Sequence, residues 1–137
     1  MRVSDAMSPN VKTVERNDAL SIADDVMRMA RIRHIVVVDE DRPGEIAGVL
    51  SQRDLFHGAL ARALGYGTSG ARKVLETVPV KEVMSSSPIT IDAGATLAEA
   101  ARRMLEHTIG CLPVIDEGRL VGIVTESDFV RLAVQNT

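Results

Sequence analysis

The sequence predicts a mixed α/β (α+β) fold made of two β-α-β-β-α repeats. Met7 recurs as Met84 and Asp39 recurs as Asp116, each 77 positions later. Short apolar runs rich in β-branched residues flank a turn in both copies, and apolar residues recur at helical spacing before and after these runs. A fixed spacing between matching segments indicates a tandem repeat, in which each copy forms one structural unit.

Each copy is expected to start with a short extended piece. Pro9 and Pro88 favour this conformation because a proline disfavours helix in the residue before it. The first piece is predicted at Val11 to Val14. The second lies within residues 85–91, where Ile, Thr and Ile alternate as in a short strand.

A helix follows each extended piece. The first is predicted from about Asn17 or Asp18 to Ala30, and the second from Thr96 to about His107. Thr96, with Glu99 three residues later, has the pattern of a capping box. The apolar stripes expected to be buried are Ala19, Ile22, Ala23, Val26, Met27 and Ala30 in the first helix and Leu97, Ala100, Ala101, Met104 and Leu105 in the second.

Two strands and a closing helix complete each copy. The strands are predicted at 34–39 with 46–51, and at 111–115 with 120–125; nearly continuous apolar runs indicate burial on both faces. The closing helices start near Gln52 and Glu126. Their apolar residues are Leu55, Phe56, Ala59, Leu60 and Ala63 in the first and Phe129, Val130, Ala133 and Val134 in the second.

The repeat divides the chain into a first copy at 1–64, a linker at 65–79 and a second copy at 80–137. Gly65 to Gly70 is glycine-rich and is expected to be a flexible connection, and a short helical entry to the second copy is expected within 75–84. Copies of about 60 residues are marginally stable alone, so one fused core is expected.

The composition favours a cytoplasmic protein that binds neither nucleic acid nor membranes. The content is 45% apolar and 26% charged with a net charge of −3, which gives no general attraction for phosphate backbones. No apolar run approaches the roughly 20 residues that span a bilayer. The start of the chain lacks the apolar centre of a signal peptide, and the single cysteine cannot form an internal disulfide.

Catalytic motifs are not evident, and the prediction is a protein that is not an enzyme. His34, His57 and His107 lie far apart and show no metal-ligand spacing, although a metal site assembled by the fold stays open. Cys111 falls in a predicted buried strand with no cationic neighbour to activate it, so it is interpreted as a small core residue.

The segments Ser51 to Asp54 and Thr125 to Asp128 lie at strand-to-helix junctions in both copies. A hydroxyl residue followed three positions later by an acid is a capping box at a helix start. The same carboxylate could accept hydrogen bonds from a ribose diol, and the nearby hydroxyl and unpaired amide groups could hold phosphate. Both interpretations remain open, because a duplicated fold also duplicates its caps.

The pattern IGCLPVID…GRLVGIVTESDF closely resembles the CBS domain, and its earlier copy, with IRHIVVVD and GVLSQRD, makes the chain resemble a Bateman module. The resemblance runs from about Val3 to Leu132. It implies two repeats packed through their sheets with pseudo-twofold symmetry, and a cleft between them that binds adenosine compounds.

The resemblance also implies the ligand-binding residues. The site of the second repeat comprises Pro88, Ile89, Thr90, Leu112, Pro113, Thr125, Ser127 and Asp128. For the site of the first repeat the resemblance implies Val11, Lys12, Thr13, Ile35, Ser51, Arg53 and Asp54, and Arg33 and His34 are added to this site because they gather with Arg53 as cations of the first copy. The first copy departs from the family at Val36, where a proline is expected. Arg33, His34 and Arg53 could neutralise phosphate charges or form a solvated basic rim.

Three functions follow. The first is a regulatory sensor of AMP, ADP, ATP or S-adenosylmethionine, which requires no cofactor and signals by changed packing or through an unidentified effector protein. The second is a structural or dimerisation module without nucleotide binding. The third, less favoured, is a metal-linked protein that uses its histidines. The resemblance implies a homodimer in the first two cases.

Overall fold

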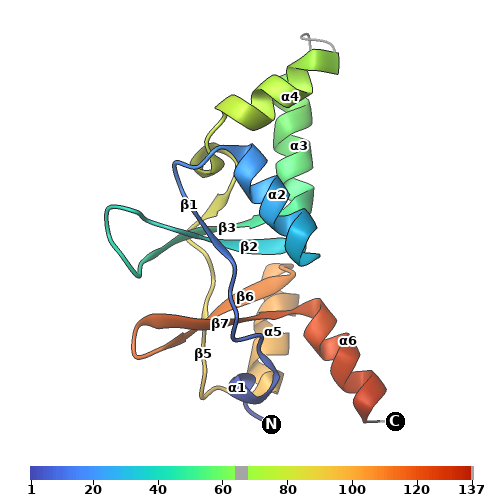
Figure 1. Ribbon diagram of the computed structural model, residues 1–137. Coiled ribbons are helices and arrows are strands. Elements are labelled where there is room, and N and C mark those ends of the chain that lie inside the picture. The colour runs from blue at the N-terminus through green and yellow to red at the C-terminus, as the bar shows by residue number, and fades with distance from the viewer. Residues whose placement is uncertain (64–67, 137) are drawn as a thin grey trace. The chain divides into compact units, whose positions relative to one another are not determined.

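A computed structural model describes residues 1–63 and 68–136 (Figure 1). The chain divides into two compact units. The first unit is Lys12–Ser87, and the second unit combines Met1–Val11 with Pro88–Thr137. Each is a mixture of helices and one sheet, as the sequence predicts, and each is described by itself.

The sheet of the first unit has the strand order β1-β2-β3-β4. β1 runs parallel to β2, and β2 forms an antiparallel hairpin with β3, which in turn pairs with β4. In Figure 1 the loop of this hairpin projects away from α2 and α3. The strands are β1 Thr13–Glu15, β2 His34–Val38, β3 Ile46–Ser51 and β4 Ser85–Ser86.

Three helices and a short 3-10 helix complete the first unit. Burial of their apolar residues against the sheet stabilises them, and α4 packs against α2 and α3. The core gathers residues that are 0% exposed, among them Leu20, Ile35, Leu50 and Leu55. The elements are α2 Leu20–Ala30, α3 Gln52–Ala63, α4 Thr68–Thr77 and η1 Val80–Glu82.

The second unit has a three-stranded sheet in the order β5-β6-β7 and its own core. β5 runs parallel to β6, which forms an antiparallel hairpin with β7. Thr96 caps α5 by accepting a hydrogen bond from the Glu99 amide at 3.1 Å, as predicted. The elements are α1 Val3–Ala6, β5 Ile91–Asp92, α5 Leu97–His107, β6 Cys111–Asp116, β7 Arg119–Thr125 and α6 Glu126–Gln135.

The leading segment of each repeat packs with the other repeat. Val3 in α1 and Val80 in η1 occupy matching repeat positions, and both are 0% exposed. Val3 belongs to the core of the second unit, whereas Val80 belongs to that of the first. Ser8 exchanges two backbone hydrogen bonds with Ile123 of β7, at 2.9 and 3.0 Å. The boundaries predicted from the sequence (1–64, 65–79 and 80–137) therefore describe the sequence repeats. They differ from the boundaries of the compact units.

The hairpins and the starts of both closing helices at Gln52 and Glu126 are confirmed. The first helix begins later than predicted, at Leu20, because the Asp18 carbonyl accepts the Val80 amide at 2.7 Å and Ala19 is extended. The strand expected within 85–91 is split into β4 and β5, one in each unit.

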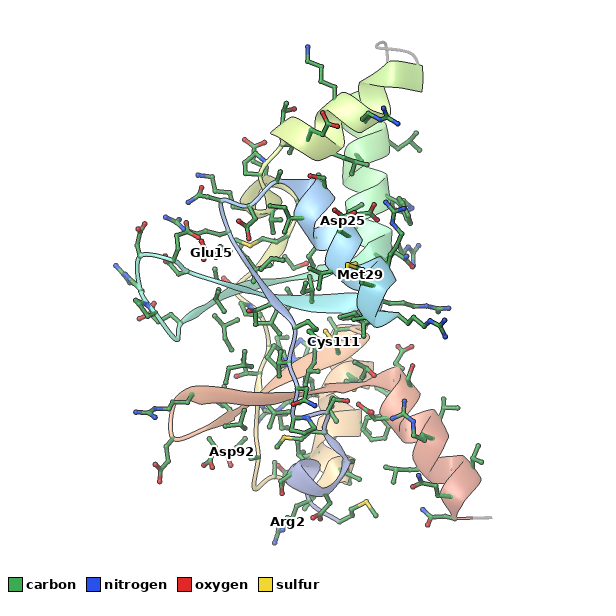
Figure 2. All side chains as sticks on the ribbon, viewed as in Figure 1. Arg2, Glu15, Asp25, Met29, Asp92 and Cys111 are labelled. Carbon is green, nitrogen blue, oxygen red and sulfur yellow. The ribbon has the colours of Figure 1, made fainter. Side chains whose placement is uncertain are left out.

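Several residues of the predicted buried stripes are exposed. Leu105 is 82% exposed and Ile22 is 45% exposed, so the stripes of α5 and α2 are narrower than predicted. Met29 at the end of α2 is also exposed (Figure 2). The closing helices likewise bury only part of their apolar residues. Exposed apolar side chains on these two helices are Phe56, Leu60, Val130, Ala133 and Val134.

The expected connection at Gly65 to Gly70 is partly wrong. Residues 65–67 lie outside the described residues, but Thr68 to Gly70 form the first turn of α4. Packing of α4 on α3 and α2, with Val74 in the core, overrides the local glycine preference. No described helix is both long and apolar enough to cross a membrane.

Candidate functional site

The strand register of the first unit brings together three segments that are distant in sequence. Because β1 is parallel to β2, with Thr13 opposite Val36, the start of β1 lies beside the start of β2. His34 at the start of β2 faces Ser51 at the end of β3. Residues 12–13, 33–35 and 51–54 therefore meet at one end of the sheet, which we call the first strand-end site.

A pocket of about 250 Å³ opens at this site. Arg33 and Arg53 are exposed, whereas His34 and Ser51 are half-buried. The sequence prediction named these four residues and missed the other two, which lie on α3. The pocket is lined by Arg33, His34, Ser51, Gln52, Arg53 and Phe56. Helical periodicity could have indicated Phe56. It lies three residues after Arg53 and four after Gln52, and residues at these spacings share a helix face.

The remaining residues predicted for the first site are not among those lining the pocket. Ile35 is 0% exposed and belongs to the core. Lys12 and Thr13 are exposed and Asp54 is half-buried, while Val11 is half-buried and belongs to the second unit. The side chain of Ile35 is therefore closed off, and a ligand could contact this residue only through its backbone atoms.

The start of α3 has fewer unpaired amides than the sequence suggested. The Ser51 hydroxyl accepts the Asp54 amide at 3.0 Å, which caps the helix. The Gln52 amide donates to the Arg33 carbonyl at 2.8 Å. Two of the first three amides of α3 thus already donate hydrogen bonds within the protein. They are not free to bind a phosphate at this helix start. The cationic side chains are the stronger anion-binding feature.

The second unit forms the same arrangement, which we call the second strand-end site: residues 88–90, 112–113 and 125–128. Cys111 faces Thr125, and β5 pairs in parallel with β6 through Ile91 and Val114. The Glu126 amide donates to the Gly110 carbonyl at 3.1 Å, as Gln52 does to Arg33. The pairing alone therefore brings the predicted segments together.

The residues predicted for the second site differ in their access to solvent. Ser127 is exposed, and Pro88, Ile89, Thr90 and Thr125 are half-buried. Leu112 is 0% exposed within the core, and Pro113 is buried. Cys111 is buried too, as expected of a small core residue (Figure 2).

Asp128 forms the complete capping box at the start of α6. One carboxylate oxygen accepts the Thr125 amide at 2.8 Å, and the other accepts a hydrogen bond from Arg131 at 2.9 Å. The residue is 4% exposed. The capping interpretation is confirmed for this copy. A ligand would have to use the remaining lone pairs of a carboxylate whose two oxygens already accept hydrogen bonds.

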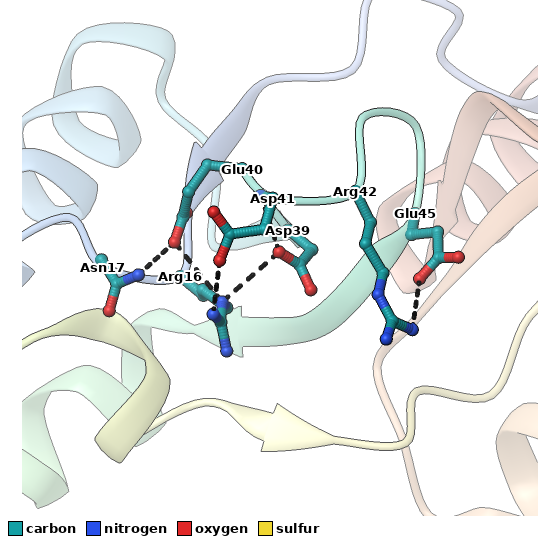
Figure 3. A network of polar contacts seen from close by, with 7 residues as sticks. All are labelled: Arg16, Asn17, Asp39, Glu40, Asp41, Arg42 and Glu45. Carbon is teal, nitrogen blue, oxygen red and sulfur yellow. Dashed lines mark hydrogen bonds and ion pairs between the residues drawn. The ribbon is translucent and has the colours of Figure 1, made fainter.

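A separate polar network occupies the β2–β3 loop (Figure 3). The guanidinium of Arg16 lies within 3.5 Å of carboxylate oxygens of Asp39, Glu40 and Asp41, while Asn17 donates to Glu40. The charge of Asp39 and a hydrogen bond to Asp41 raise the pKa of Arg16. This arginine, which no sequence motif singled out, offsets the repulsion among the three acidic side chains.

The three histidines do not form a metal site with the neighbours that the structure describes. His57 and His107 are exposed, and His34 is half-buried. Within residues 1–63 and 68–136, the group of three metal-capable side chains within 4.8 Å of one another is Asp39, Glu40 and Asp41. The Arg16 guanidinium already neutralises part of that charge.

Comparison with known proteins agrees with the two repeats seen in the sequence. A family model described as "CBS domain" matches residues 3–60 and 80–135. The chain is 32% identical to the CBS domain-containing protein YhcV of Bacillus subtilis over 98% of this chain and 86% of that protein.

Solved structures of similar fold include complexes with adenosine compounds. The CBS domain pair of the protein MJ0100, solved with 5′-methylthioadenosine and S-adenosyl-L-methionine, superposes with a TM-score of 0.81 at 26% identity, covering 100% of this chain and 98% of that one. CBSX2 in complex with AMP superposes with a TM-score of 0.75 at 29% identity, covering 98% and 97%. Two matches to one family model, each over a full repeat, leave no competing assignment: the chain belongs to the CBS domain family and carries two copies of that domain in tandem.

Proposed function

We propose that this chain is a regulatory module that binds an adenosine compound at its strand-end sites and passes the signal to a partner. The pocket of about 250 Å³ at the first strand-end site carries the proposal, because four of the residues predicted for this site from the sequence line it. CBS domain pairs of similar fold have been solved with AMP and with S-adenosylmethionine. AMP, ADP, ATP and S-adenosylmethionine are therefore the candidate ligands.

In the first site we assign phosphate contacts to Arg33, His34 and Arg53, which line the pocket with Ser51. Guanidinium groups bind phosphate through paired, charge-assisted hydrogen bonds. Asp54 is the candidate acceptor for the ribose hydroxyls. Val11, Lys12 and Thr13 would frame the base together with backbone atoms of Ile35.

In the second site we assign the ribose to Asp128 and the phosphate to Thr125 and Ser127. The half-buried segment of Pro88, Ile89 and Thr90 would frame the base together with backbone atoms of the buried Leu112 and Pro113. The engaged carboxylate of Asp128 makes this the weaker of the two assignments.

A ligand changes the state of the protein only if its affinity differs between two arrangements. We propose that the ligand shifts the packing of the repeats and so alters binding to a second copy of the chain or to an effector protein. Each closing helix exposes apolar side chains that a homodimer could bury: Phe56 is 53% exposed and Leu60 65% on α3, and Val130 is 65% exposed and Val134 72% on α6. No reaction is part of this proposal, since CBS-domain proteins are typically regulatory. The cytoplasmic setting remains an inference from the cysteine count.

One observation favours a second candidate, a structural or dimerisation module that binds no nucleotide. Both oxygens of the Asp128 carboxylate already accept hydrogen bonds from the protein, and apolar side chains of the closing helices are exposed. Both features would be needed by a scaffold without a ligand.

Calorimetric titration with AMP, ADP, ATP, NADH and S-adenosylmethionine separates the two candidates. The sensor predicts binding by at least one adenosine compound, weakened about tenfold or more in Asp54→Asn or Asp128→Asn, because an amide lacks the charge that strengthens hydrogen bonds from ribose. The isosteric amide keeps the size of the side chain. Asp116→Asn removes an exposed charge at the end of β6, outside both sites, and should leave affinity unchanged.

The structural module predicts no heat with any of these compounds. It also predicts a dimer whose stability is indifferent to them. Sedimentation of the wild type and of Leu60→Glu, with and without ligand, measures this directly. A monomer in all conditions would remove both the dimer and the scaffold.

A further inference from the structure

The two strand-end sites match in backbone geometry but differ in charge. His34 and Cys111 each face the hydroxyl residue that ends the hairpin, and the Gln52 and Glu126 amides each donate to the carbonyl before that strand. These pairings define equivalent positions in the two sites. The first site carries Arg33, His34, Gln52 and Arg53 where the second carries Gly110, Cys111, Glu126 and Ser127.

The two arginines of the first site are available to a ligand. Across the part of the chain that the structure describes, no carboxylate forms an ion pair with Arg33 or Arg53, although Arg16, Arg28 and Arg42 each have such a partner. In the second unit two guanidinium groups lie near the site: Arg131 is bound to Asp128 at 2.9 Å, and Arg103 donates to the Thr90 carbonyl. An anion would therefore meet two guanidinium groups without a carboxylate partner in the first site, whereas those near the second site already donate to protein oxygens.

We propose that the pocket of the first strand-end site binds adenosine compounds that carry two or three phosphates with higher affinity than those that carry one or none. This inference rests on the proposed function and adds the specificity of the first site. Each added phosphate adds negative charge within reach of Arg33 and Arg53, whereas the arginines near the second site already donate to Thr90 and Asp128. A chain should thus bind one polyphosphate ligand at high affinity.

The test is calorimetric titration with adenosine, AMP, ADP, ATP and inorganic tripolyphosphate, at fixed ionic strength and without divalent cations. In the wild type, affinity should rise about tenfold from AMP to ATP, with one ATP bound tightly per chain. In Arg33→Ala/Arg53→Ala, ATP affinity should fall about thirtyfold or more, while AMP affinity falls much less. Both arginines are exposed, so the fold should be retained, as circular dichroism can verify.

Arg102→Ala/Arg119→Ala is the matched control, since it removes the same two charges from exposed arginines of α5 and β7 outside both sites. It should leave the ratio of ATP affinity to AMP affinity unchanged. The inference is overturned if wild-type affinity is independent of phosphate number, or if the control lowers ATP affinity as much as Arg33→Ala/Arg53→Ala does.

The tripolyphosphate arm separates failure of the inference from failure of the proposed function. Binding of adenosine compounds with no phosphate preference removes the inference and leaves the sensor standing. Binding of tripolyphosphate without any measurable contribution from adenosine removes the sensor and leaves an anion pocket. If neither tripolyphosphate nor any adenosine compound binds, both proposals fall.

Discussion

Asp128 shows how one carboxylate can satisfy a structural and a functional pattern at once. From the sequence, the acid three residues after Thr125 fits a helix cap as well as a ribose acceptor. The structure shows the cap. The carboxylate accepts hydrogen bonds from the Thr125 amide and the Arg131 side chain, and the residue is 4% exposed. Loss of ligand binding in an alanine variant would thus be ambiguous without a stability measurement.

Asp128→Ala should lower the free energy of unfolding by about 1–2 kcal/mol, because the Thr125 amide and the Arg131 side chain lose their acceptor. Asp128→Asn should lower it less, since the amide oxygen can still accept one bond. Urea unfolding monitored by circular dichroism measures both. Asp116→Ala, at the exposed end of β6, is the control and should change little. A null effect for Asp128→Ala would contradict the capping role.

Arg16 is the residue that holds three carboxylates of the β2–β3 loop together (Figure 3). Arg16→Gln should lower the urea midpoint, because Asp39, Glu40 and Asp41 would then repel one another. Added salt should restore part of the loss by screening that repulsion. Arg42→Gln breaks a single exposed pair with Glu45 at 3.7 Å and should have a smaller effect. Equal effects from both variants, or no salt dependence, would show that the network contributes nothing beyond an ordinary surface pair.

The elements of the fold depend on close backbone approach at two matching glycines, Gly48 in β3 and Gly122 in β7. A Cβ at Gly48 would lie 2.5 Å from the Ser85 carbonyl oxygen, so the neighbouring backbone would have to move. At Gly122 the nearest backbone atom is the Ser8 carbonyl oxygen at 3.1 Å, and the severe contact is with the flexible side chain of Met7.

Gly48→Ala should therefore destabilise the protein by about 1–3 kcal/mol, and Gly122→Ala by less, because a methionine can move more easily than a strand. Met7→Ala combined with Gly122→Ala should be less destabilised than the sum of the single substitutions, as double-mutant analysis of urea unfolding can measure. Strict additivity would show that the methionine is not the source of the strain.

Local patterns predicted most elements because each pattern is decided within a few residues. The hairpins and the helix starts at Gln52 and Glu126 followed from apolar runs and capping residues. What failed depends on distant partners. Leu20 starts α2 because the Asp18 carbonyl binds the Val80 amide, and Leu105 is exposed at a position that periodicity alone assigns to the core.

The site was predictable to the same degree. Repetition of a strand-to-helix motif pointed to residues 51–54 and 125–128, and the register brings the expected segments together at each of the two sites. The sequence did not indicate that Phe56 and Gln52 line the pocket, nor that Ile35 and Leu112 are sealed in the cores. Those facts depend on how each helix is rotated on its sheet, which packing decides.

At the scale of the whole molecule, the two compact units do not follow the order of the chain. The second unit takes its α1 from the beginning of the sequence, held by the Ser8–Ile123 bonds and by a bond from the Val3 amide to Ala95 at 2.8 Å. The first unit takes η1 and β4 from residues 80–86. Each unit therefore requires a segment that precedes the other repeat, so neither repeat cut at its sequence boundary would contain a complete core.

Two matched substitutions test this crossed arrangement. Val3→Ala should destabilise the second unit by about 2 kcal/mol, because Val3 is 0% exposed in its core, and should speed amide hydrogen exchange in β6 and β7 more than in β2 and β3. Val80→Ala should show the reverse, with faster exchange in β2 and β3. Hydrogen exchange followed by mass spectrometry resolves these strands. If Val3→Ala acted first on β2 and β3, the leading segment would belong with its own repeat. If each substitution sped exchange equally in both hairpins, the chain would unfold as one cooperative body rather than as two units.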